Sequence, residues 1–328
     1  MRRFSRGGVL LIAALAIAAC GAGPTTEGGE PGTPGAADSP AQSGGAGDTP
    51  GAGGAVNTHG AGDTPVAADS PVAGDSPVAG ADETRPHPAF DVSAAELEAL
   101  LETSPESTQQ AVSRRPQYFL ELAAALLDLP PAQLRLVDKQ HALPADAVPD
   151  DLIELDRYAD TLTLNRSGLS LRAVIMPDLL AMTEAARQDG ILLPISSTYR
   201  SYEYQAGLFE RYADEMGVQE ASRISARPGT SQHQLGTTVD FGSITLAFAD
   251  TRAGRWLAEH AEEFGFSMSY PDGYEELTGY SFEPWHFRWI GRRATEMESA
   301  FFDGLQQHML EFWDEHAQTL RTQMSGTQ

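Results

Sequence analysis

The stretch Ser231-Gln-His-Gln-Leu-Gly-Thr-Thr-Val-Asp240, together with Glu283-Pro-Trp-His286, decides how this chain is expected to fold and what it is expected to bind. His233, Asp240 and His286 supply two imidazoles and one carboxylate. That combination is a ligand set for a catalytic zinc ion, which takes three protein ligands and leaves one position open for water. Glu283 lies three residues before a ligand, so its carboxylate can reach that water without binding the metal. The two segments predict a metal-dependent hydrolase.

The residues around the ligands predict short strands. Gly236 suggests a bend, so His233 is expected on a loop or at the start of a strand. Residues 237–241 are β-branched and aromatic, which favours a strand carrying Asp240. Residues 285–290 also favour a strand, because large apolar side chains alternate with polar ones along them. Two adjacent strands can therefore point all three ligands into one cleft.

Simpler interpretations exist for each residue taken alone. A histidine next to Trp285 is often a satisfied core residue, and a lone Asp240 often serves as a turn or cap. The joint occurrence of the ligands with Glu283 favours the metal site. A serine peptidase is disfavoured because the chain contains no Ser-x-x-Lys motif, and its single lysine is Lys139.

Four segments, in order along residues 135–292, resemble the VanY-type zinc D-alanyl-D-alanine carboxypeptidases, within the M15 metallopeptidases that cleave peptidoglycan. Two are the metal segments already quoted. The others are Val137-Asp-Lys-Gln-His-Ala-Leu-Pro144, continued by 148–152, and Ser196-Ser-Thr-Tyr-Arg-Ser201. The chain departs from the family pattern at Thr198 and Thr238, where the family usually has Gly and Ala. Neither change touches a ligand, so they bear on pocket shape.

The resemblance implies one zinc ion per chain and a role for each matching residue. It also implies an α+β fold of the D-Ala-D-Ala carboxypeptidase and hedgehog type, in which a small, mostly antiparallel sheet carries the zinc and helices surround it. The implied residues are the zinc ligands His233, Asp240 and His286, the general base Glu283, the substrate- and oxyanion-contacting Arg200, and Ser231 and Gln205 near the substrate.

The implied reaction is hydrolysis of the terminal D-Ala-D-Ala bond of peptidoglycan stem peptides. The same chemistry also fits an L,D-carboxypeptidase or a peptidoglycan endopeptidase, because stereochemistry is read by pocket shape. A wall-binding lipoprotein without turnover is a third possibility, and the presence of both Glu283 and Arg200 argues against it.

Residues 1–20 have the features of a bacterial lipoprotein signal peptide. A basic start precedes an apolar run too short for a comfortable membrane span, and the run ends at Cys20, the only cysteine of the chain. We expect Cys20 to carry lipid and to hold the protein on an extracytoplasmic face of the bacterial envelope. An ordinary cleaved signal peptide is the alternative. A single cysteine excludes disulfides within the chain and a thiolate zinc ligand.

Residues 21–88 are rich in Gly, Ala, Pro, Ser, Thr and Asp, and they repeat short Gly-Asp-Thr-Pro and Asp-Ser-Pro themes. Such a segment lacks the apolar surface needed to offset ordering entropy, so it is predicted to be an extended tether. The net charge of −24 argues against nucleic acid as a partner. We expect a monomer.

Beyond the tether we expect a helical lead-in over 89–134, a zinc peptidase domain over 135–292 and a C-terminal helix over 293–328 packed on the domain. Ser93 and Glu96 form a capping-box pattern that begins a first helix. Apolar spacing predicts further helices and two additional strands. The helices are expected over 116–129, 169–188, 202–216, 252–264 and 292–321, and the strands over 191–195 and 266–270.

Overall fold

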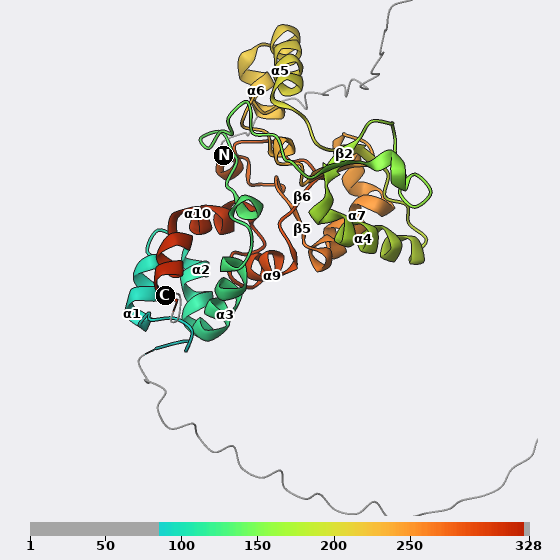
Figure 1. Ribbon diagram of the computed structural model, residues 1–328. Coiled ribbons are helices and arrows are strands. Elements are labelled where there is room, and N and C mark those ends of the chain that lie inside the picture. The colour runs from blue at the N-terminus through green and yellow to red at the C-terminus, as the bar shows by residue number, and fades with distance from the viewer. Residues whose placement is uncertain (1–84, 325–328) are drawn as a thin grey trace, which may run out of the picture. The chain divides into compact units, whose positions relative to one another are not determined.

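The structure is a computed structural model that describes residues 85–324, all within one compact unit, Val78–Gln328. Figure 1 shows the course of the chain. The predicted signal peptide, Cys20 and nearly all of the predicted tether lie outside the described residues, as do residues 325–328. Among the described helices, none has both the length and the apolar character needed to cross a lipid bilayer.

Within residues 85–324 the structure has two small antiparallel sheets surrounded by helices, which confirms the predicted α+β class. The first sheet pairs β1 (Leu152–Glu154) with β2 (Ser170–Arg172). The second has the strand order β3-β4-β6-β5 and is antiparallel throughout. Its strands are β3 (Ile195–Ser197), β4 (Thr238–Phe241), β6 (His286–Trp289) and β5 (Phe266–Met268).

Strands β4 and β6 are buried along their whole length. Successive side chains of a strand point to opposite faces. One face of the pair therefore carries the apolar side chains, which join a core cluster with α4 (Met176–Gln188) and α7 (Arg252–His260). The opposite face carries Asp240, His286 and the fully buried Arg288. Alternation along two short strands thus separates the polar site from the apolar core.

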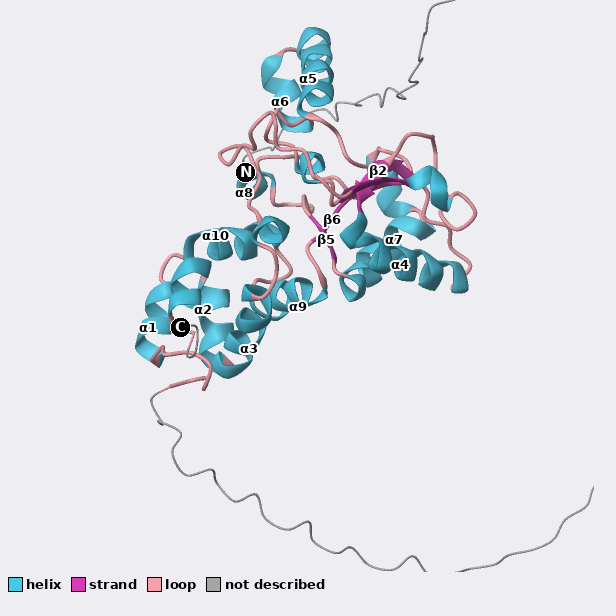
Figure 2. Ribbon diagram, in the orientation of Figure 1, coloured by secondary structure: helices cyan, strands magenta, loops and turns pink. Residues whose placement is uncertain are grey.

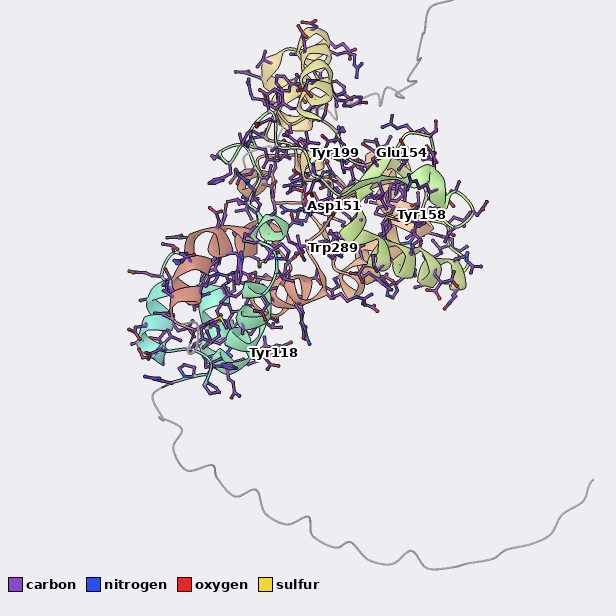
Figure 3. All side chains as sticks on the ribbon, in the orientation of Figure 1. Tyr118, Asp151, Glu154, Tyr158, Tyr199 and Trp289 are labelled. Atoms are coloured by element: carbon purple, nitrogen blue, oxygen red, sulfur yellow. The ribbon has the colours of Figure 1, made fainter. Side chains whose placement is uncertain are left out.

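A helical group packs around a second apolar core. Within this core the ring of Phe119 meets that of Phe301 edge-on, with centroids 5.2 Å apart. Figure 2 shows the helices of this group together. In Figure 3, Tyr118 lies among these helices, and Trp289 lies between the helical group and the part of the molecule that carries β1 and β2. The group comprises α1 (Ala94–Leu100), α2 (Glu106–Arg114), α3 (Pro116–Leu127), α9 (Arg292–Phe301) and α10 (Gln306–Thr322).

Several predicted elements are found where they were expected. The capping box of Ser93 and Glu96 begins α1, and α3 ends before the two prolines at 130 and 131. Helix α5 has the predicted bounds Tyr202–Met216. It is followed by α6 (Val218–Ile224), with which it forms the projecting pair in Figure 1, and later by the short α8 (Glu275–Thr278).

Three expectations about elements were wrong. The helix expected over 169–188 starts only at Met176, because residues 170–172 pair with β1 and bury Leu171. The strand expected over 191–195 is displaced and begins at Ile195. The single C-terminal helix expected over 292–321 is two helices, broken where Asp303 and Gly304 both adopt positive φ angles of 55° and 69°. That turn sends α10 back against α3 and α9.

Candidate metal centre

The three predicted ligands come together in space. His233 lies in the 3₁₀ turn η4 (Gln232–Leu235), Asp240 lies in β4, and His286 is the first residue of β6. Antiparallel pairing places Asp240 directly opposite His286. Gly236, with a φ of 71°, ends η4 and turns the chain into β4. One possible ligand atom from each of the three residues lies within 4.8 Å of the others.

The inner atoms of the ligands face one another. His233 Nε2 lies 3.3 Å from Asp240 Oδ2, and His286 Nδ1 lies 3.2 Å from Asp240 Oδ1. All three side chains are almost completely buried. Even so, His233 Nε2 and Asp240 Oδ1 have no hydrogen-bond partner. Buried polar atoms without partners are costly. A cation bound among them would satisfy both, so the residues fit a metal ion.

The outer ring nitrogens are held by protein oxygens. His233 Nδ1 donates to the carbonyl oxygen of Thr198 at 2.7 Å, and His286 Nε2 donates to Oε1 of Gln232 at 3.2 Å. A neutral imidazole carries one N–H and one free lone pair. These outer contacts therefore place His233 Nε2 and His286 Nδ1 on the inner side, where each offers a lone pair once its ring is neutral. Metal-binding histidines are typically oriented in this way.

Burial and neighbouring charges shift the pKa values of the ligand group. Burial, aided by Arg200, lowers the pKa of His233 to about 4, so this ring is neutral at pH 7. Burial alone would lower the pKa of His286, but Asp240 and Glu283 outweigh it and raise the pKa to about 9. Burial likewise opposes ionisation of Asp240, and His233 with His286 nevertheless holds its pKa below the usual range.

Glu283 and Arg200 lie beside the ligand group on its more exposed side. Glu283 Oε2 is 3.3 Å from His286 Nδ1, and Arg200 Nη2 is 3.9 Å from Asp240 Oδ2. The two side chains are 15% and 18% exposed, whereas the ligand side chains are at most 4% exposed. Burial raises the pKa of Glu283, which makes its carboxylate a better proton acceptor. Nε of Arg200 has no hydrogen-bond partner.

The two remaining predicted residues have different surroundings. Ser231 is buried directly before η4, two residues from His233. Gln205 is buried in α5, where its Nε2 donates to the carbonyl oxygen of Ala226 at 2.7 Å, while its Oε1 has no hydrogen-bond partner. Its described contacts attach α5 to the segment after α6. Substrate contact by Ser231 and Gln205 stays a prediction.

Sequence reasoning missed the residues that support the ligands. Thr198 contributes only a backbone oxygen, which no side-chain pattern can reveal. Gln232 lies inside the quoted motif, between Ser231 and His233. That position was the one feature of the sequence that could have pointed to its contact with a ligand. Tyr270 packs its ring on that of His286, with centroids 4.7 Å apart.

Comparison with known proteins shows the family of this chain. The family model described as VanY, D-alanyl-D-alanine carboxypeptidase, matches residues 168–292. YodJ of Bacillus subtilis strain 168, a protein named as a carboxypeptidase, is 32% identical over 196 residues, which make up 56% of this chain and 71% of YodJ. The chain belongs to the VanY D-alanyl-D-alanine carboxypeptidase family.

Two further proteins are similar over about half of this chain. A D-alanyl-D-alanine carboxypeptidase of Enterococcus faecalis is 34% identical over 49% of this chain and 59% of its own length. A solved structure of the LdcB LD-carboxypeptidase is 30% identical with a TM-score of 0.49, and it covers 56% of this chain and 86% of that one.

The pKa of His286 predicts that zinc binding depends on pH. As a candidate zinc ligand, His286 has to lose its proton when zinc binds, so binding is expected to weaken as the pH falls below about 9. The apparent zinc affinity should rise about tenfold per pH unit between pH 7 and pH 9 and then level off, because one proton is released. Chelator competition across this range measures the slope. An affinity independent of pH between 7 and 9 would show that His286 carries no such proton.

Proposed function

We propose that the chain is a zinc-dependent carboxypeptidase that hydrolyses the terminal D-Ala-D-Ala bond of peptidoglycan stem peptides. One observation carries the proposal. Two buried histidines and an aspartate lie together, two of their inward-facing atoms have no hydrogen-bond partner, and Glu283 lies beside them. They do so in a chain of the VanY family, which supports this substrate class.

The proposed zinc ligands are His233, Asp240 and His286. The chemistry supplied by zinc at this place is Lewis-acid stabilisation of negative charge and acidification of a water molecule. Glu283 is proposed as the general base that takes the proton of the attacking water and later passes it to the leaving amine. Its raised pKa favours the first transfer, because the carboxylate accepts the proton more readily. The second transfer remains downhill because the leaving amine is a stronger base than a carboxylate.

Arg200 is proposed to bind substrate and to stabilise the oxyanion that develops on the scissile carbonyl group. Its side chain is partly exposed beside the ligand group, and its Nε has no partner within the described residues. The chain carries a net charge of −24. A peptide carboxylate gains little from that overall field, so a local guanidinium is needed to attract it.

The reaction and its stereochemistry are tested with defined stem peptides. Zinc-loaded protein should remove one D-Ala from a pentapeptide ending in D-Ala-D-Ala and should leave the resulting tetrapeptide intact, as followed by mass spectrometry. Removal of D-Ala from the tetrapeptide alone would indicate an L,D-carboxypeptidase. Cleavage of cross-linked dimers would indicate an endopeptidase. Zinc binding without cleavage of any of these peptides would indicate a wall-binding protein that does not catalyse the reaction.

Replacement of the general base separates metal binding from turnover. Glu283→Gln should keep zinc, because Glu283 is not a ligand, and should lose about 10²- to 10⁴-fold in kcat on the pentapeptide. Glu276→Gln, at an exposed glutamate on α8, is the matched control and should behave as the parent protein. Turnover by Glu283→Gln within a few-fold of the parent would reject the assigned base.

We also propose that Cys20 carries lipid and that residues 21–88 tether the enzyme to an extracytoplasmic membrane surface, where peptidoglycan is within reach. The sequence pattern around Cys20 supports this. Stable anchoring needs more than one acyl chain, which a lipidated N-terminal cysteine can provide. Cys20→Ala should therefore move the protein from the membrane fraction to the soluble fraction on immunoblots of fractionated cells. Membrane association that survives the substitution would refute lipid attachment at Cys20.

A further inference from the structure

Three buried polar side chains from separate parts of the chain meet on the outer side of His286. They are Gln232, the first residue of η4, Ser269, which directly follows β5, and Gln306, the first residue of α10. Each is at most 3% exposed. The active-site chemistry proposed above uses none of them. Polar side chains buried this deeply are costly unless their hydrogen bonds are made in a defined arrangement.

The hydrogen bonds of this series all donate in one direction, from His286 through Gln232 and Gln306 to a backbone carbonyl oxygen. Gln306 Nε2 donates to the carbonyl oxygen of Ser267 at 3.4 Å, and Gln306 Oε1 accepts from Gln232 Nε2 at 3.2 Å. Gln232 Oε1 then lies 3.2 Å from Nε2 of His286. Ser269 Oγ lies 2.7 Å from Gln232 Oε1 and 3.2 Å from Gln306 Oε1.

The carbonyl oxygen of Ser267 fixes the orientation of both glutamine amide groups in this series of hydrogen bonds. A backbone carbonyl oxygen can only accept, so the amide nitrogen of Gln306 must face Ser267. The amide oxygen of Gln306 then faces Gln232 and holds its amide nitrogen, which leaves the oxygen of Gln232 toward His286. Nε2 of His286 must therefore carry a hydrogen, and the lone pair available for a metal is the one on Nδ1.

We propose that Gln306 and Gln232 are positioning residues that set the tautomer and ring orientation of His286 as a zinc ligand. The inference rests on the proposed function, because it requires His286 to bind zinc. Partners of this kind, one step behind a metal ligand, typically contribute 10- to 100-fold to metal affinity or activity.

Gln306 brings the helical group into the site. It begins α10, whose following residues Met309, Leu310, Phe312 and Trp313 are buried in the core of that group. The position of Gln306 is therefore set by packing outside the sheet that carries the ligands. It also lies beyond residues 168–292, over which the family model matches. In this chain the C-terminal helix thus completes the surroundings of the metal site.

The test measures zinc affinity of the full chain by chelator competition, alongside thermal unfolding of the zinc-free protein. Gln232→Leu should weaken zinc binding 10- to 100-fold, and Gln306→Leu should weaken it in the same direction by about tenfold. Gln232→Glu should recover much of the loss, because a carboxylate still accepts from His286. A merely structural role predicts no such recovery. In variants that retain zinc, kcat on the pentapeptide should fall while KM stays near that of the parent.

Gln307→Leu is the matched control, since Gln307 is the next residue of α10 and is also buried, but it donates to Asp138 and Glu311 instead. It should bind zinc as the parent does. If Gln306→Leu does not fold, Gln306→Met replaces it, and Gln232→Leu carries the same test independently.

Folded Gln232→Leu and Gln306 variants with zinc affinities within twofold of the parent would overturn the inference while leaving the proposed function intact. An equal loss in Gln307→Leu would also overturn it, because the effect would then come from general destabilisation of α10. Failure of the parent chain itself to bind zinc would instead refute the proposed function, and the inference with it.

Discussion

The pairing of Asp240 with His286 across β4 and β6 is the constraint on which the rest of the structure depends. A slip of one residue in either strand would turn that strand's polar side chains into the apolar core and its apolar side chains into the site. The buried Val239 and Phe287, packed against α4 and α7, hold the register. The same apolar contacts that stabilise the sheet therefore bring the candidate ligands together.

A second feature is that the site is supported from two independent cores. The core beneath the sheet holds the candidate ligands in place, whereas the helical group holds Gln306 behind His286. Arg288 of β6 also connects the sheet to the helical group. Its buried Nη2 donates to the carbonyl oxygens of Gln133 and Arg135, in the segment that follows α3. The helices on either side of the family match are thus structurally coupled to the candidate centre.

The sequence predicted the ligand cluster, β4, β6 and α5, because each depends on residues close together in the chain or on a motif of fixed spacing. It did not predict the supporting contacts. Gln232 meets Gln306 across 74 residues, and His233 meets the backbone of Thr198 across 35, so no local pattern records either contact. The break at Asp303 was missed because the apolar spacing of a helix continues on both sides of it.

The most direct measurement is anomalous X-ray scattering at the zinc absorption edge from crystals of zinc-loaded protein. We expect one peak per chain, in contact with Nε2 of His233, a carboxylate oxygen of Asp240 and Nδ1 of His286. The two ring nitrogens are the inner ones, because the outer hydrogen bonds occupy the other nitrogen of each ring. A peak bound through Nε2 of His286, or a single strong peak away from these three residues, would contradict it.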